Sequence, residues 1–159
     1  MDVSPRVYGP YHTAFVVPSL EETMDEFTRI LGLRWREART APLRVRTHDG
    51  DVIDATSRFV HSQGAPSIEL FEGVANTYLE GGDRPRFHHI GYWVDDLASR
   101  SAEVSMCGWA WQQDVVTSQH PMPPAAIHET SFGYLELLNL EFPRGEYYSD
   151  LYPPHHRPR

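Results

Sequence analysis

The chain contains an internal repeat that spans most of its length. The first copy begins at Tyr11-His12-Thr13-Ala14-Phe15 and ends at Ser67-Ile68-Glu69-Leu70-Phe71. The second copy begins at His88-His89-Ile90-Gly91-Tyr92 and ends at Tyr134-Leu135-Glu136-Leu137-Leu138. Each copy therefore carries a histidine in its opening apolar segment and a glutamate in its closing one. Because polar residues are duplicated inside apolar segments, the repeat indicates a common site as well as a common core.

Both copies show the same order of predicted elements. After each opening strand, Ser19 or Asp96 caps an amphipathic helix, and Gly32 or Gly108 ends it by adopting a left-handed backbone. Strand-like runs follow each helix, at 33–39, 43–48, 51–60 and 67–72 in the first copy and at 109–116, 125–130 and 134–140 in the second. Apart from the extra hairpin run of the first copy, each copy thus reads βαβββ, which is an α+β pattern. The Asp49-Gly50 hairpin turn adds residues to the first copy alone.

The two-residue period of a strand decides which way the repeated residues point. His12 and His89 lie on one face of their strands, while apolar residues such as Phe15 and Tyr92 lie on the other. A helix must cover the apolar face. The histidines and glutamates therefore face a different space, which the two copies can share if both curve the same way.

Length and composition predict a single domain over residues 1–159. Within it we expect a first module at about 8–75, a linker at 76–85, a second module at about 86–141 and a proline-rich C-terminal extension at 142–159. The linker contains the sequence Gly81-Gly82-Asp83-Arg84-Pro85, which is typical of an irregular connection.

Charge and hydropathy exclude two classes of partner. A formal net charge of −8 with no basic stripe argues against nucleic acid. No apolar run approaches the roughly 20 residues of a membrane span, and the N-terminus lacks the apolar region of a secretion signal. The single cysteine, Cys107, cannot form an internal disulfide. We therefore expect a cytoplasmic protein whose partner is a small molecule.

The four repeated polar residues, His12, Glu69, His89 and Glu136, suit a metal ion. Two neutral imidazoles and two carboxylates together form a donor set for one divalent ion, which can be Ni, Co, Mn, Fe or Zn. Four protein ligands on a six-coordinate ion leave two positions open, where substrate oxygens can displace water and be polarised. The set therefore predicts a catalytic rather than a purely structural metal.

At these four residues the chain resembles the vicinal oxygen chelate superfamily, which includes glyoxalase I, methylmalonyl-CoA epimerase, extradiol dioxygenases and bleomycin-resistance proteins. The resemblance runs from about Gly9 to Leu140. It implies that paired βαβββ modules form a curved, cup-like mixed sheet with helices on the outside. It also implies a metal at the bottom of the cup, held by residues from the first and last strand of each module, and a homodimer.

Three positions depart from the best-known members of this superfamily. Val16 and Gly73 stand where bacterial glyoxalase I carries an arginine and an asparagine that help to bind glutathione. Glu69 stands where methylmalonyl-CoA epimerase commonly carries glutamine. The first two departures argue against a glutathione-dependent lyase, although the ligand set itself matches that of glyoxalase I.

The resemblance leaves three functions open. The first is a metal-dependent isomerase, epimerase or lyase, in which the substrate chelates the metal, passes through an enolate-type intermediate and gives up a proton to Glu69 or Glu136. The second is an Fe(II)-dependent extradiol-type dioxygenase that uses only His12, His89 and Glu136 as ligands. The third is a non-enzymatic protein that binds or sequesters a small molecule. The complete ligand set favours the first.

Four further residues are candidates for the substrate pocket. Trp93 shares a strand face with His89, and Tyr134 shares one with Glu136. His120 and His128 flank a proline-rich loop that precedes the last strands. For all four, a purely structural role in the core or in a loop is the alternative interpretation.

Overall fold

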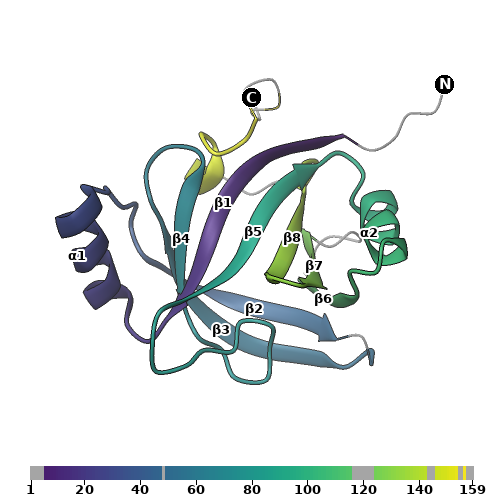
Figure 1. Cartoon of the computed structure of the whole chain (residues 1–159), viewed down its shortest axis with the longest axis horizontal. Helices are drawn as coiled ribbons and strands as arrows, with labels where there is room; N and C mark the ends of the chain where they lie inside the picture. The colour runs from purple at the N-terminus through teal and green to yellow at the C-terminus, as the bar shows by residue number, and fades with distance from the viewer. Residues whose placement is uncertain (1–5, 48, 116–123, 143–145, 154–155, 157–159) are drawn as a thin grey trace.

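The computed structural model describes residues 6–47, 49–115, 124–142, 146–153 and 156 (Figure 1). Over these residues, the chain forms β1 (Val7–Val17), α1 (Leu20–Leu31), β2 (Arg39–Thr47), β3 (Val52–His61), β4 (Ser67–Glu72), β5 (Arg86–Val94), α2 (Leu97–Met106), β6 (Trp111–Val115), β7 (Ala125–Thr130), β8 (Gly133–Asn139) and the short 3-10 helix η1 (Glu146–Tyr148). The order from β1 to β4 is repeated from β5 to β8. Each copy is therefore a βαβββ module.

The predicted strand at 33–39 is wrong. Before β2 begins at Arg39, only Trp35 of this segment forms a β-bridge, and that is an isolated bridge to Ser62. The indole of Trp35 turns back to α1, where its Nε1 donates to the carbonyl of Met24 at 3.2 Å and to Oγ1 of Thr28 at 3.0 Å. A half-buried indole N–H needs such hydrogen-bond acceptors. The segment therefore forms a connection between α1 and β2, and not a strand of its own.

The eight strands form one closed barrel in the order β1-β4-β3-β2-β6-β7-β8-β5. The pairs β1–β4 and β5–β8 are parallel, and β1 and β5 run antiparallel at the junction of the modules. The barrel closes where β2 pairs with β6, for example at Val45 and Val115. The prediction of a curved mixed sheet is confirmed, and the modules also join at their far edges.

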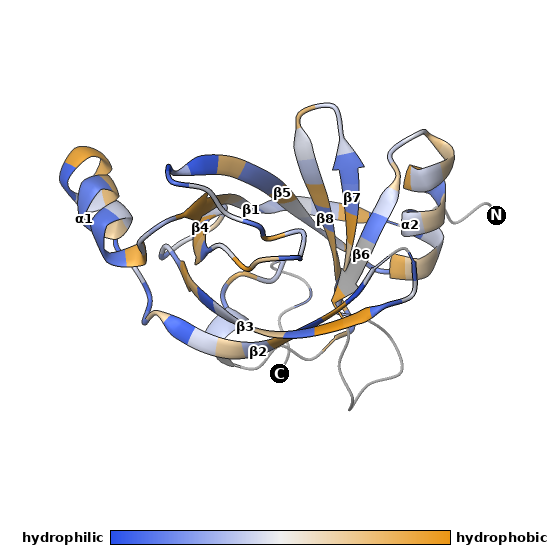
Figure 2. Cartoon of the chain, turned by 90° about the horizontal axis from the view of Figure 1, so that it is seen from below, coloured by the Kyte–Doolittle hydropathy of each residue, from blue (hydrophilic) through white to orange (hydrophobic). Residues whose placement is uncertain are grey.

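The two helices cover opposite sides of the barrel (Figure 1). Their caps follow the sequence pattern: the Ser19 hydroxyl accepts from the Glu22 N–H, the Asp96 carboxylate accepts from the Ser99 N–H, and Gly32 has a φ of 69°. Each helix covers an apolar patch on the outward face of the strands. The cluster beneath α1 includes Leu20, and the cluster beneath α2 includes Leu97. Figure 2 shows the alternation of hydrophilic and hydrophobic residues along β2. None of the described helices has both the length and the apolar composition needed to cross a membrane.

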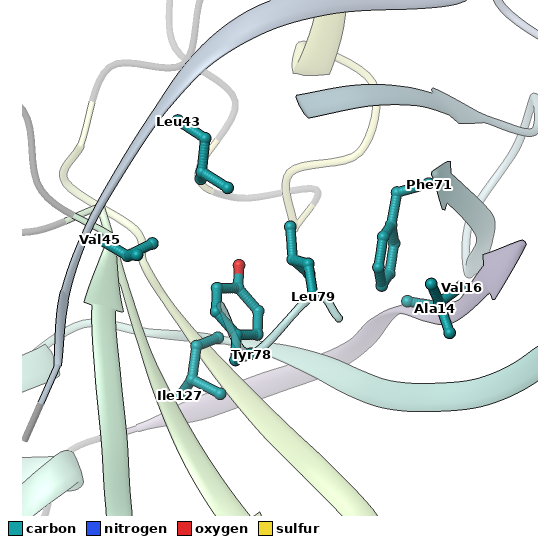
Figure 3. Close-up of a cluster of buried hydrophobic side chains, with 8 residues drawn as sticks. All are labelled: Ala14, Val16, Leu43, Val45, Phe71, Tyr78, Leu79 and Ile127. Carbon is teal, nitrogen blue, oxygen red and sulfur yellow. The ribbon is translucent and has the colours of Figure 1, made fainter. Parts of the chain in front are cut away.

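Two apolar clusters fill the barrel. We call the first the linker-end cluster, because it includes two residues of the predicted linker; its members are Ala14, Val16, Leu43, Val45, Phe71, Tyr78, Leu79 and Ile127 (Figure 3). We call the second the extension-end cluster, because it includes two residues of the C-terminal extension; its members are Tyr11, Trp93, Leu138, Leu140, Leu151 and Tyr152. Tyr78 and Leu79 lie in the middle of the first cluster. The predicted linker therefore contributes to the interior of the barrel.

Candidate metal centre

Strand register brings the repeated histidines and glutamates together. Across the antiparallel β1–β5 pair, His12 lies opposite Gly91 and Ala14 lies opposite His89. Across the parallel pairs, Ala14 lies beside Glu69 and Gly91 lies beside Glu136. Glu69 of the first module therefore lies beside the residue that faces His89, and Glu136 of the second module lies beside the residue that faces His12. All four side chains come from one chain and meet where the modules join.

The donor atoms of the four side chains lie close together, and the distances between the histidine nitrogens and the carboxylate oxygens suit one metal ion. His12 Nε2 lies 2.7 Å from His89 Nε2 and 3.2 Å from the Oε2 atoms of both Glu69 and Glu136. His89 Nε2 lies 3.4 Å from the same two oxygens. Donor atoms bound to one ion at about 2.1 Å lie about 3.0–3.4 Å apart in octahedral or tetrahedral geometry. The group His12, His89 and Glu136 could hold a metal ion, and Glu69 Oε2 lies at the same distances from the two histidine nitrogens as Glu136 Oε2 does.

The electrostatics of this centre favour a cation. Burial disfavours the charged form of Glu69, but His61, His12 and His89 outweigh it and lower the pKa of Glu69 to about 2. Burial also opposes ionisation of Glu136, yet hydrogen bonds from His12 and His89 hold its pKa well below the usual range. Burial lowers the pKa of His89, but Glu136 and Glu69 outweigh it and raise the pKa to about 9. Two buried carboxylates thus stay ionised beside the histidines.

A neighbouring histidine fixes the tautomer of His89. His88 Nε2 contacts the carbonyl oxygen of Tyr78, which only accepts, so this nitrogen carries the proton. Burial lowers the pKa of His88 to about 3, so the ring is neutral and its Nδ1 accepts. His89 Nδ1 lies 2.8 Å away and must therefore donate. The lone pair of neutral His89 is then on Nε2, the atom that faces the carboxylates.

Sequence reasoning missed His61, which lies beside the centre. This buried residue ends β3, pairs with Glu69 across the β3–β4 ladder, and places its Nε2 3.5 Å from Glu69 Oε1. Its Nδ1 lies 3.1 Å from the hydroxyl of Ser67. Burial lowers its pKa to about 4, so the ring is neutral. In the sequence, the sign of a role for His61 is its position at the end of the strand that precedes Glu69. The second copy has no equivalent histidine, so the repeat could not reveal this residue.

The predicted pocket residues Trp93, Tyr134 and His128 contact other side chains, and Tyr134 lies beside His89 in the β5–β8 register. Trp93 belongs to the extension-end cluster, stacks on Tyr152 with ring centroids 4.5 Å apart, and donates from Nε1 to the Leu151 carbonyl. Tyr134 stacks on His88 at 4.8 Å. His128 on β7 is buried, with contacts to the hydroxyl of Ser101 on α2 and to the carbonyl of Trp109, which follows α2. His120 lies outside the described residues.

A cavity of about 200 Å³ opens onto the centre. Glu69, His89 and Glu136 contribute to its wall. Its remaining lining comes from β2, β3, β4, the predicted linker, β6 and η1, and consists of Ala41, Pro42, Leu43, Ser57, Phe59, Phe71, Tyr78, Leu79, Val115 and Tyr148. A ligand in this cavity therefore meets two carboxylates on one side and mainly apolar side chains on the others.

Several solved structures share this fold at low sequence identity. Methylmalonyl-CoA epimerase from Mycobacterium tuberculosis aligns with a TM-score of 0.50 and 13% identity over 80% of this chain and 85% of its own. Methylmalonyl-CoA epimerase from Streptomyces coelicolor, a variant in complex with 2-nitronate-propionyl-CoA, aligns with a TM-score of 0.51 and 13% identity over 84% of this chain and 98% of its own. A variant of 4-hydroxymandelate synthase from Streptomyces coelicolor aligns with a TM-score of 0.55 and 13% identity over 84% of this chain and 39% of its own.

Comparison with curated proteins gives no match. A family model, however, matches residues 11–133, which contain both predicted histidine ligands and the whole of the first module from Tyr11 onward. The match also covers the second module up to the start of β8. The chain therefore belongs to the Glyoxalase/Bleomycin resistance protein/Dioxygenase superfamily.

Proposed function

We propose that this protein is a metal-dependent isomerase, epimerase or lyase that moves a proton on a small oxygenated substrate. The convergence of four donor atoms beside a cavity that Glu69, His89 and Glu136 line is the observation that carries this proposal. His12, Glu69, His89 and Glu136 would hold one divalent ion. When bound, such an ion would polarise a substrate carbonyl and stabilise negative charge that develops on its oxygen.

Glu69 is the better candidate for the base that takes the proton. Its Oε2 faces the histidine ligands, while its Oε1 faces His61 Nε2 at 3.5 Å. The hydroxyl of Ser67 lies within hydrogen-bonding distance of the Ser62 and Ile68 carbonyls, so it donates to them and accepts from His61 Nδ1. His61 Nε2 is then free to accept a hydrogen bond from a protonated Glu69. This contact would stabilise Glu69 once it has taken the substrate proton, whereas the histidines around it keep it ionised before that step.

Glu136 has a different set of contacts. Its Oε2 lies beside both histidine ligands, and hydrogen bonds from these two side chains lower its pKa. We therefore assign Glu136 to holding the ion throughout, and Glu69 both to holding the ion and to taking the proton, for which its carboxylate would leave the ion. Return of the proton to the same carbon would give epimerisation, and return to the neighbouring carbon would give isomerisation.

A dioxygenase is the second candidate function, and one observation supports it. His12, His89 and Glu136 group tightly without Glu69, and two histidines with one carboxylate form the ligand set of many non-haem Fe(II) oxygenases. In this alternative Glu69 stays off the metal and acts only on the proton of the substrate.

Solvent exchange separates these candidates. The protein would be loaded in turn with Ni²⁺, Co²⁺, Mn²⁺, Zn²⁺ and anaerobic Fe²⁺, and incubated in D₂O with a panel of small α-hydroxyketones. We expect metal-dependent exchange of the C–H next to the carbonyl, seen by NMR, which Glu69→Gln abolishes while metal content is retained. Oxygen consumption with catechols by the Fe²⁺ form alone would support the dioxygenase. Wild-type protein that retains none of these ions after dialysis would overturn both.

We also propose that the protein forms a homodimer in which each chain holds a complete site. The four donors converge within one chain, so the site does not require a residue from a second copy. Light scattering coupled to gel filtration would give the mass in solution, and a metal-to-chain ratio of one would agree with one site per chain.

A further inference from the structure

We infer that the substrate of this site is an uncharged, compact molecule whose body is apolar. This inference rests on the proposed function, and it adds the chemical class of the molecule on which that function acts. It comes from three properties of the cavity, namely the side chains that line it, the charge around it and its size.

The walls away from the metal centre are mainly apolar. Leu43, Phe59, Phe71, Leu79 and Val115 supply aliphatic and aromatic surface from four different strands and the predicted linker. The polar side chains among the described lining residues, apart from the donors, are the hydroxyls of Ser57, Tyr78 and Tyr148. A ligand body that fills this space is therefore removed from water without gaining charged partners, which favours apolar groups.

Outside the metal centre, no positively charged side chain on the described part of the chain faces this space. The chain has no lysine, and its fourteen basic residues are all arginines. None of the described arginines lines the cavity. Three of them, Arg36, Arg44 and Arg58, form ion pairs with Asp150, Asp54 and Glu21 instead.

The charge of the centre itself is also balanced. Two carboxylates offset the two positive charges of a divalent ion, and the two histidine ligands are neutral when they coordinate. No net positive charge is left to hold a phosphate, a carboxylate or a sulfonate on the body of the substrate. Burying such a group here would cost its solvation free energy without a compensating partner.

The size of the cavity limits the molecule further. Its volume of about 200 Å³ lies below the roughly 300–1,000 Å³ of pockets that take drug-sized ligands. At the packing density of protein interiors it holds a molecule of about ten non-hydrogen atoms. Conjugates with a large polar carrier would have to place that carrier outside the cavity.

Two matched hydroxamic acids test the inference, because a hydroxamate presents two adjacent oxygens to a metal. The probes are benzohydroxamic acid and its 4-carboxy derivative, which differ only by a carboxylate on the ring. The protein would be loaded with Co²⁺, its metal content measured, and each probe titrated by calorimetry and by the visible spectrum of Co²⁺. We expect benzohydroxamic acid to bind at least about tenfold more tightly than the carboxylated probe.

A pair of variants places a charge on the wall and controls for its bulk. Ser57 lies on β3 among the lining residues, and Ser57→Arg would supply the missing cation while Ser57→Met adds length without charge. We expect Ser57→Arg to narrow or reverse the preference between the probes, and Ser57→Met to keep the preference of the wild type. Circular dichroism would show whether each variant folds, and if one does not, the wild-type comparison still decides.

The outcomes separate this inference from the proposed function. Wild-type protein that binds Co²⁺ but prefers the carboxylated probe, binds both equally or binds neither would overturn the substrate class while leaving the metal centre in place. Wild-type protein that binds no Co²⁺ would overturn the proposed function, and the inference with it.

Discussion

The imidazole of His12 lies directly on the backbone of Gly91. The two residues face each other across β1 and β5, and a Cβ at position 91 would lie 2.8 Å from His12 Nδ1 and 2.9 Å from its Nε2. These distances are shorter than any ordinary contact of a Cβ atom. The equivalent residue of the first module, Ala14, faces His89 and does carry a Cβ. The repeat is therefore asymmetric at this point, and only the His12 ring requires a glycine.

Substitution of Gly91 by alanine should displace the His12 ring. We expect Gly91→Ala to lower metal affinity by at least about tenfold and to reduce the free energy of unfolding by about 1–3 kcal/mol, because the added methyl group overpacks a buried site. Metal titration and denaturant unfolding would measure the two effects. Gly82→Ala is the control, since nothing lies within 4 Å of a Cβ there. Unchanged metal affinity in Gly91→Ala would show that His12 is not a ligand.

Removal of the His88 ring nitrogens should weaken metal binding without removing a ligand. His88→Phe retains a ring of similar size between Phe71 and Tyr134 but cannot accept from His89 Nδ1. Loss of such a partner lowers metal affinity by roughly 10–100-fold in other proteins. We expect an effect in this range, measured by competition with a chromogenic chelator. Tyr134→Phe, which keeps the stacked ring, should bind metal as the wild type does, and equal affinity in all three proteins would contradict the assigned tautomer.

The repeat made much of this architecture predictable. The two modules, the helix caps at Ser19 and Asp96, and the orientation of His12 and His89 toward the interior could be predicted. These features depend on local sequence and on the two-residue period of a strand. His61 and the interior position of Tyr78 depend instead on strand register and on the path of a loop, which neither period nor propensity fixes. The role of Gly91 follows from the distance between two strands and was likewise beyond local sequence.

The attachment of the C-terminal extension to the barrel should depend on the side chain of Arg36. This side chain donates from Nη1 to the Tyr147 carbonyl at 3.0 Å and from Nη2 to both carboxylate oxygens of Asp150, at 2.8 and 2.7 Å. We expect Arg36→Ala to increase the rate of proteolysis within residues 146–153 severalfold, because one side chain holds both a carbonyl and a carboxylate of this segment. Limited proteolysis with mass spectrometry would locate the cleavage. Arg44→Ala, which removes an exposed pair with Asp54, is the control and should leave this rate unchanged.

Metal affinity and metal-free stability should change in opposite directions between about pH 6.5 and pH 9. Glu136 and Glu69 outweigh burial and raise the pKa of His89 from 6.5 to about 9, so without metal its ring keeps a proton through this range. Metal competes with that proton, and affinity should rise by about tenfold per pH unit with release of about one proton. The stability that the raised pKa contributes is complete below pH 6.5 and is lost as the pH rises through 9.

Calorimetry in buffers of different ionisation enthalpy would count the protons released on metal binding. Denaturant unfolding of the metal-free protein would show whether its stability falls as the pH rises. His89→Gln removes the titrating ring and should flatten the dependence of metal-free stability over this range. A wild-type protein whose metal affinity does not change between pH 6.5 and pH 9 would show that the proton on His89 does not compete with metal, and hence that His89 Nε2 does not coordinate it.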